Sequence, residues 1–268
     1  MSDLLLQTRD ARGVVTLTLN DAPRFNALGS AMLQALQDAL DEIAQDASVR
    51  VVVLAANGKA FCAGHNLKDM AAQPQLAYYQ TLFAQCSRMM LSIAKLPVPV
   101  IARVHGMATA AGCQLVAQCD LAVASTQASF ATSGINYGLF CATPSVPLVR
   151  NVPFKQAMEM LLTGDFIDAA TAQAQGLVNR AVAPEALDMH VEQLVQSIVQ
   201  KPATAVRMGK ALLYRQREMG LEAAYVLAGE TMACNMALPK ALKRGASFKV
   251  NVTTPRASRV CSNKSLMV

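Results

Sequence analysis

The sequence predicts an α/β fold, in which short buried strands alternate with helices in the first half and helices alone form the last third. Two apolar runs carry this prediction. Residues 50–55 (RVVVLA) have the continuous apolar character of a strand buried on both faces of a sheet. Residues 98–104 form a second β-branched run, which ends at the small-residue stretch 105–112. Segments with apolar residues three and four positions apart follow, as in helices with one buried face.

Taken in order, residues 4–9 and 14–19 are short apolar runs that predict a β-hairpin. Ser30 is expected to cap the first helix, because its hydroxyl can accept a hydrogen bond from a first-turn N–H. Asp168 is the expected cap of a later helix. The remaining elements are expected as strands at 121–124 and 177–181, a loop at 138–147, and helices at about 75–95, 154–163, 169–175, 185–200, 203–218 and 221–237.

The composition points to a globular protein with some surface buried between subunits. The chain has 268 residues, of which 53% are hydrophobic and 16% are charged. That length is enough for a sizeable core, and the apolar fraction is high for a globular chain. We expect no membrane span, because no apolar run reaches the roughly 18 residues that a spanning helix needs. We also expect no secretory signal at the N-terminus.

The cysteines indicate a reducing compartment, and we therefore expect a cytoplasmic location. Their number is odd, no CxxC pair occurs, and most lie among apolar or small residues. This usage favours buried thiols over a disulfide framework or a zinc site. The three histidines have no metal-ligand spacing, so we expect no metal site. The cysteines are Cys62, Cys86, Cys113, Cys119, Cys141, Cys234 and Cys261.

The net charge of +6 comes from the C-terminal end. Seven of the 24 basic residues and no acidic residue lie after Glu230, so the preceding part carries 17 basic and 18 acidic residues. A nearly neutral body without an arginine- and aromatic-rich stripe argues against RNA or DNA as a partner.

Two small-residue loops suggest a site for a carbonyl oxygen. Residues 104–118 (VHGMATAAGCQLVAQ) favour a strand, a tight loop and a helix start, and residues 57–67 form a similar loop after the strand at 50–55. The first N–H groups of a helix have no partner inside the helix. Two such donors could bind charge that develops on a carbonyl oxygen, as in an oxyanion hole. The alternative is a pair of turns tightened only for packing.

Several motifs resemble those of the crotonase superfamily, the enoyl-CoA hydratases and isomerases. They are APRFNAL (22–28), GKAFCAGHNL (58–67), PVIARVHGMATAAGCQLVAQCDLAVAS (99–125), FATSGINYGLF (130–140) and AMEMLLTGDFIDAATAQAQGLVNRAV (157–182). The resemblance implies a crotonase-type spiral of ββα turns with a C-terminal helical region. It implies a core with a CoA thioester pocket at 1–200, a helical trimerisation region at 201–248, and an irregular tail at 249–268.

The resemblance also implies the ligand and the assembly. The ligand would be an acyl-CoA thioester, with coenzyme A as part of the substrate and no covalently bound cofactor. The assembly would be a homotrimer or a dimer of trimers. The backbone N–H groups of His65 and Ala111 would hold the thioester oxygen.

Four residues are expected to bind coenzyme A. Arg24 and Phe25 match positions that contact the CoA nucleotide, and Ala63 matches one that faces the adenine. Lys68 is the fourth residue that we expect to bind coenzyme A.

The sequence departs from the hydratase pattern at the two proton-transfer positions. Gln114 and Gly134 stand where family hydratases have glutamates, and neither can transfer a proton. We therefore expect inefficient hydration and leave two alternatives open. One is another acyl-CoA reaction, such as thioester hydrolysis, decarboxylation or isomerisation. The other is a non-catalytic acyl-CoA-binding or regulatory protein. The side chains of His65, Cys141, Asn136 and Tyr137 are weaker candidates for a role at the site.

Beyond about residue 238 the resemblance ends. This end lacks the acid-containing helix of the family, and our hypothesis is that it is out of frame or otherwise altered.

Overall fold

The computed structural model describes residues 4–238, which divide into two compact units. The first ends at Ile198 and the second begins at Val199. The expected tail at 249–268, and with it the hypothesis of an altered C-terminal end, lies outside the described residues.

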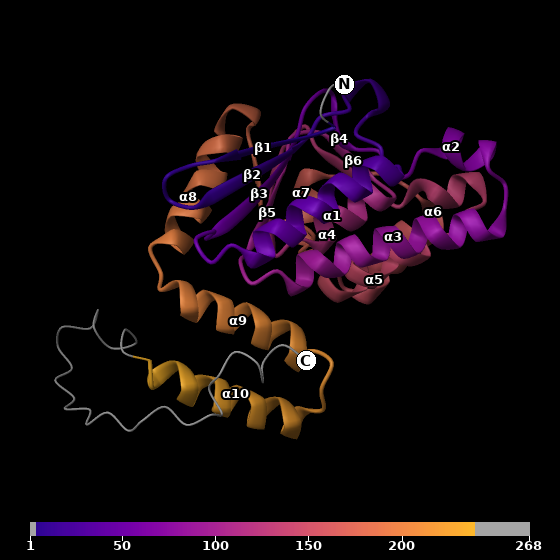
Figure 1. Ribbon diagram of the computed structural model, residues 1–268. Coiled ribbons are helices and arrows are strands. Elements are labelled where there is room, and N and C mark those ends of the chain that lie inside the picture. The colour runs from indigo at the N-terminus through magenta and orange to yellow at the C-terminus, as the bar shows by residue number, and fades with distance from the viewer. Residues whose placement is uncertain (1–3, 239–268) are drawn as a thin grey trace. The chain divides into compact units, whose positions relative to one another are not determined.

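A six-stranded sheet runs through the first unit in the order β1-β2-β3-β5-β7-β10 (Figure 1). Strands β1 and β2 pair antiparallel, which confirms the predicted hairpin, and the other neighbours pair parallel. Every residue of β3 is buried, as its apolar run predicts. The strands are β1 (Leu5–Arg9), β2 (Val14–Leu19), β3 (Val51–Ala56), β5 (Val100–Val104), β7 (Leu121–Ser125) and β10 (Arg180–Val182).

A second sheet has four short strands in the order β4-β6-β8-β9. They are β4 (Ala60–Cys62), β6 (Met107–Thr109), β8 (Ser129–Ala131) and β9 (Ile167–Asp168). The pairs β3–β4, β5–β6 and β7–β8 each place one strand in the large sheet and the next in the small one, and a helical segment follows each pair. This repeat is the ββα spiral of the crotonase fold.

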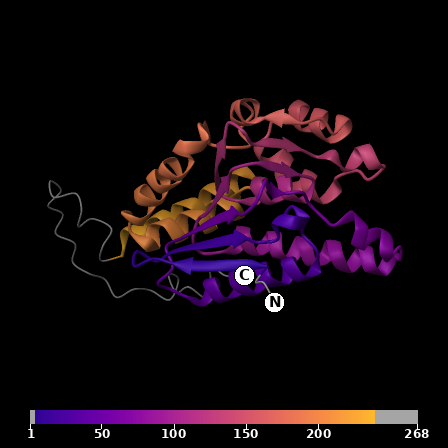
Figure 2. The same cartoon turned by 90° about the horizontal axis from the view of Figure 1, so that it is seen from above.

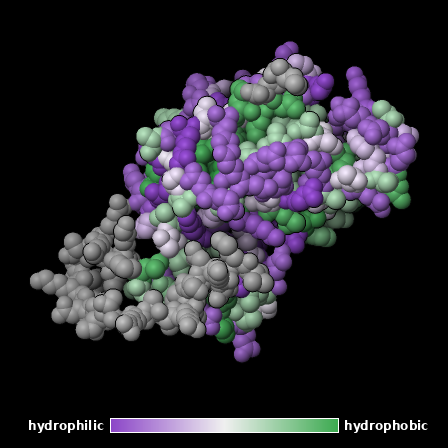
Figure 3. Space-filling model, viewed as in Figure 1, coloured by the Kyte–Doolittle hydropathy of each residue, from purple (hydrophilic) through white to green (hydrophobic). Residues whose placement is uncertain are grey.

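Helices pack around these sheets, and both views show α1 beside α3 (Figures 1 and 2). Over α1 and α3 the face in Figure 3 is mostly hydrophilic, while Leu33, Leu36 and Leu40 of α1 are buried on the other side. The helices of this unit are α1 (Ser30–Gln45), α2 (Leu67–Ala72), α3 (Leu76–Lys95), α4 (Ala111–Gln118), α5 (Ala142–Asn151), α6 (Phe154–Thr163), α7 (Ala169–Ala174) and α8 (Leu187–Val199). Short 3₁₀ turns are η1 (Ala22–Arg24), η2 (Ser133–Tyr137) and η3 (Pro184–Ala186).

Two local predictions are wrong and one is confirmed. Ser30 is the first helical residue of α1, and the cap is Gly29, which offers no side-chain hydrogen bond. The segment expected as a loop at 138–147 contains the first half of α5. Asp168 caps α7 as predicted, because its carboxylate accepts a hydrogen bond from the Thr171 N–H.

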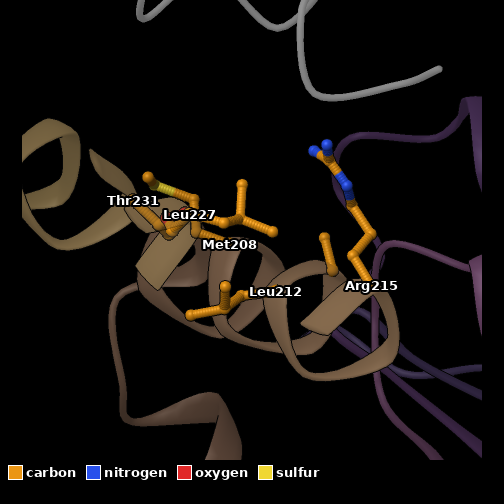
Figure 4. A pocket seen from close by; sticks show the side chains of 6 residues that line it. Met208, Leu212, Arg215, Leu227 and Thr231 are labelled. Carbon is orange, nitrogen blue, oxygen red and sulfur yellow. Dashed lines mark hydrogen bonds between the residues drawn. The ribbon is translucent and has the colours of Figure 1, made fainter. Parts of the chain in front are cut away.

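The second unit contains α9 (Ala203–Gln216) and α10 (Leu221–Met236), which pack against each other. A cavity of about 20 Å³ lies between them, lined by Met208, Leu212, Leu227 and their neighbours (Figure 4). A space of that size holds about one water molecule, so it is no acyl-CoA site. Within residues 4–238, no helix is long and apolar enough to cross a membrane.

Candidate active site

The two small-residue loops of the sequence lie in contact. Gly64 follows β4 and has φ +86°. A Cβ atom at this position would lie 2.9 Å from the Cβ atom of Ala110 and 3.0 Å from the backbone nitrogen of Ala111. The close approach and the positive φ both require glycine. Glycine at position 64 therefore lets the loop after β4 approach the start of α4.

Two backbone N–H groups at this contact have no acceptor among the described residues. One belongs to His65, which follows Gly64, and the other to Ala111. Ala111 is buried and opens α4, so its N–H lies at the positive end of the helix dipole. An unpartnered donor next to a helix N-terminus favours an oxygen atom that carries negative charge.

The backbone before α4 is strained. Ala110 has φ 51° and ψ −120°, a conformation that residues with a side chain rarely adopt. Its N–H donates a 3.0 Å hydrogen bond to Ala131 O, which ties the loop to β8. At Gly112, a Cβ atom would lie only 2.0 Å from Cys62 O. These contacts hold the N-terminus of α4 against the end of β4.

The His65 imidazole is turned toward the loop before α1. Its Nδ1 lies 2.8 Å from Leu28 O, and its ring centroid lies 5.5 Å from that of Phe83 on α3. A carbonyl oxygen only accepts, so Nδ1 donates and Nε2 keeps its lone pair. Nε2 is buried and has no hydrogen-bond partner among residues 4–238. Burial lowers the pKa of His65 and outweighs the Leu28 hydrogen bond, which favours the protonated ring.

The two positions of the missing glutamates have different surroundings. Gln114 lies buried on α4, and none of the described residues donates a hydrogen bond to its Oε1. Gly134 lies in η2, where a Cβ atom would lie 2.7 Å from Leu139 O and 2.9 Å from Cys141 Sγ. The Cys141 thiol therefore lies where a side chain at 134 would begin. Its position against Gly134 was not expected from the sequence.

The cysteines around the site are protonated at neutral pH. Burial raises the pKa of Cys62 and of Cys113 to about 12. Burial also raises the pKa of Cys141, although the Gly134 N–H partly opposes this. Thiolate chemistry is therefore disfavoured here.

The residues expected to bind coenzyme A lie on the loop before α1 and around the loop after β4. The side chains of Arg24 and Phe25 are largely exposed, and Lys68 is an exposed residue of α2. The Ala63 N–H donates a 3.0 Å hydrogen bond to Phe25 O, which joins the two loops. A cavity of about 240 Å³ beside Arg24 is also lined by Asp21 and Asp69, whose charges disfavour phosphate inside it.

Asn26 is a structural residue of the site that the sequence reading missed. It is fully buried with φ 54°. Its Oδ1 accepts a hydrogen bond from the Asp21 N–H, and its Nδ2 donates to Asn57 O and Ala60 O at 2.8 and 2.9 Å. These bonds fix the Arg24–Phe25 turn on β4. Its place in the APRFNAL motif (22–28) is the feature of the sequence that could have identified Asn26.

Asn136 and Tyr137, two of the weaker side-chain candidates, lie at the protein surface. Asn136 and Tyr137 are exposed, the latter by 75%. No cluster of potential metal ligands occurs in the part of the chain that the structure describes.

Known proteins resemble this chain in both fold and sequence. Residues 9–246 match the enoyl-CoA hydratase/isomerase family. The chain is 44% identical over 226 residues to the enoyl-CoA hydratase domain-containing protein 3, mitochondrial, of Xenopus laevis, covering 84% of this chain and 77% of that protein. That relative is named as mitochondrial, and the cytoplasmic location expected for the present chain stays a prediction.

Two crystal structures are closely similar. An enoyl-CoA hydratase from Mycobacterium smegmatis superposes with a TM-score of 0.91 at 62% identity, covering 92% of this chain and 96% of that one. The human enoyl-CoA hydratase domain-containing protein 3 superposes with a TM-score of 0.88 at 39% identity. The match covers 92% of this chain and 97% of that one. The family match and the shared fold show that this chain belongs to the enoyl-CoA hydratase/isomerase family of the crotonase superfamily.

Proposed function

We propose that this protein acts on an acyl-CoA thioester whose carbonyl oxygen accepts hydrogen bonds from the His65 and Ala111 N–H groups. The observation that carries the proposal is the contact of the two loops at Gly64, beside two donors that have no acceptor within residues 4–238. Fixed donors of this kind stabilise an enolate or a tetrahedral oxyanion more strongly than the neutral carbonyl. The substrate class is that of fatty-acyl-CoA metabolism.

Coenzyme A would be held at the joined loops. Arg24 and Lys68 are exposed cations that can meet phosphate groups, Phe25 offers an exposed ring, and Ala63 leaves space for the adenine. Coenzyme A is thus part of the substrate, and we propose no covalently bound cofactor.

We do not expect this protein to hydrate enoyl-CoA efficiently. Hydration needs a base for water and an acid for the α carbon, and each such group contributes about 10²–10⁴ in rate. Gln114 cannot titrate, and the contacts around Gly134 leave no room for a carboxylate there. The lack of a proton-transfer group at positions 114 and 134 also favours one alternative function, which is acyl-CoA binding without turnover.

Binding of butyryl-CoA and of its S-butyl thioether analogue, which lacks the carbonyl oxygen, tests the proposal. Two hydrogen bonds contribute roughly 1–3 kcal/mol together, so calorimetry should show about 5- to 150-fold tighter binding of the thioester. Equal affinities would contradict the proposed oxyanion hole. Crotonyl-CoA turnover at the rate of ordinary hydratases would contradict the statement about hydration. Binding without turnover of any thioester would favour the alternative.

A further inference from the structure

The surroundings of the two proposed donors leave few groups that can take a proton. At position 134, the Leu139 carbonyl and the Cys141 thiol exclude a side chain. At position 114 stands an amide, and the neighbouring thiols keep their protons because burial raises their pKa. Of the two histidines on these loops, His105 has its Nε2 2.8 Å from Gly58 O, whereas His65 follows Gly64 at the contact with α4.

The His65 imidazole has a tautomer that can accept a proton. The hydrogen bond from Nδ1 to Leu28 O fixes the tautomer, so the free lone pair is on Nε2. Nε2 is buried and has no partner in the part of the chain that the structure describes, and an unsatisfied buried polar atom of this kind costs about 1–3 kcal/mol. The backbone of the same residue supplies one of the two proposed donors.

The groups around the ring leave it neutral. The Leu28 carbonyl and the Phe83 ring contact it. On the neighbouring elements, Lys68 and Asp69 of α2 are exposed and Cys86 of α3 is a buried thiol. Within the described residues, no charged side chain shifts the pKa of His65, which burial lowers. The ring is therefore unprotonated at pH 7.

We propose that His65 Nε2 is the general base that removes the α-proton of a bound acyl-CoA. This inference rests on the proposed function. The C–H bond breaks, its electron pair moves into the thioester carbonyl, and the resulting enolate oxygen is held by the His65 and Ala111 N–H groups. The proton becomes the Nε2–H of an imidazolium, which returns it to carbon. Because Nε2 is buried, a side chain that covers it must move before the acyl group can reach it.

Exchange of the α-protons of butyryl-CoA in D₂O, followed by mass spectrometry, tests this step. The variant is His65→Asn, whose amide can still donate to Leu28 O and whose backbone keeps its N–H. We expect the wild type to incorporate deuterium and the variant to lose about 10²-fold or more of that rate. Butyryl-CoA affinity should change by less than a few fold. The matched control is His190→Gln on α8, which should exchange like the wild type.

The pH profile provides a readout that does not depend on a variant. Wild-type exchange should fall as pH decreases through a pKa below the ordinary histidine value near 6.5. If the protein binds butyryl-CoA but exchanges no α-proton, or if His65→Asn exchanges like the wild type, the inference is wrong and the proposed function stands. If butyryl-CoA does not bind, the proposed function fails, and this inference fails with it.

Discussion

At residue 110 the backbone adopts a conformation that L-amino acids rarely use. The φ of 51° at Ala110 corresponds to strain of about 1–3 kcal/mol, which persists only where the surrounding structure imposes it. Here the bond to Ala131 O and the close packing at Gly112 impose it. The strain lies one residue before a donor that has no acceptor. This arrangement is consistent with a loop shaped for a ligand.

Gly64→Ala should weaken thioester binding. The new Cβ atom would lie 3.0 Å from the Ala111 nitrogen and 2.9 Å from Ala110, so it would push the two donors apart. We expect at least 5-fold weaker butyryl-CoA binding by calorimetry, in line with the loss of one hydrogen bond of about 1 kcal/mol. Gly138→Ala is the matched control, because Gly138 has φ +77° and nothing within 4 Å of its Cβ position. Equal effects of the two substitutions would show that backbone strain alone is responsible.

Asn26→Ala should destabilise the protein by about 2–4 kcal/mol. The substitution removes the hydrogen bonds that Asn26 makes to one N–H and two carbonyl groups, and a buried group left without a partner costs about 1–3 kcal/mol before relaxation. Urea unfolding measures the loss. The control is Asn136→Ala, which alters an exposed residue and should change the free energy of unfolding by less than about 0.5 kcal/mol. A stability change at Asn26 within that same range would contradict the role assigned to its bonds.

At the scale of elements, α5 determines what position 134 can hold. Its first turn follows Cys141, and the helix packs against α4. The sequence predicted a loop at 138–147 because this segment is rich in small residues, and it also contains Pro144 and Pro147. Pro144 lies in the first turn, where its missing N–H needs no helical partner. Tertiary packing against α4 supports the rest of the helix despite Pro147.

Restoring the two glutamates should not create an efficient hydratase. In Gln114→Glu/Gly134→Glu, the second substitution places a Cβ atom 2.7 Å from the Leu139 carbonyl oxygen. We expect a lower melting temperature than in Gln114→Glu alone and little crotonyl-CoA hydration in either variant. The hydration assay and thermal unfolding check this. A stable double variant that hydrates crotonyl-CoA rapidly would show that the 139–141 segment moves aside easily.

The sequence predicted the strands of the six-stranded sheet, most helices and the family, because each depends on local periodicity or on a contiguous motif, whereas the four short strands of the second sheet were not predicted. Contacts between distant segments were not predictable in the same way. The positions of Cys141 against Gly134 and of His65 against Leu28 depend on how loops from different turns of the spiral meet. The helix cap shows the same limit on a smaller scale. Ser30 has the right chemistry, but the helix begins one residue earlier than such a cap requires.

At the scale of the whole molecule, the second unit carries an unusually apolar helix. On α10, large apolar side chains remain exposed, including Leu221, Tyr225 and Met232 at 77%, 73% and 71%. A helix that is apolar around its circumference is normally buried. The predicted trimer would bury this surface.

Tyr225→Glu/Met232→Glu should therefore reduce self-association. We expect trimers or hexamers for the wild type in analytical ultracentrifugation and a shift toward monomers for the variant, because a buried charge is costly. Glu222→Gln on the same helix is the control and should leave the assembly unchanged. A wild type that is monomeric at all concentrations would contradict the prediction.

The hydrogen bonds from His65 and Ala111 to a thioester oxygen are the central claim. Infrared spectroscopy of bound butyryl-CoA, labelled with ¹³C at the carbonyl, tests them most directly. We predict a C=O stretch at lower frequency than in free butyryl-CoA, a smaller shift in Gly64→Ala, and the full shift in Gly138→Ala. An unshifted carbonyl band in wild-type protein saturated with butyryl-CoA would contradict the account.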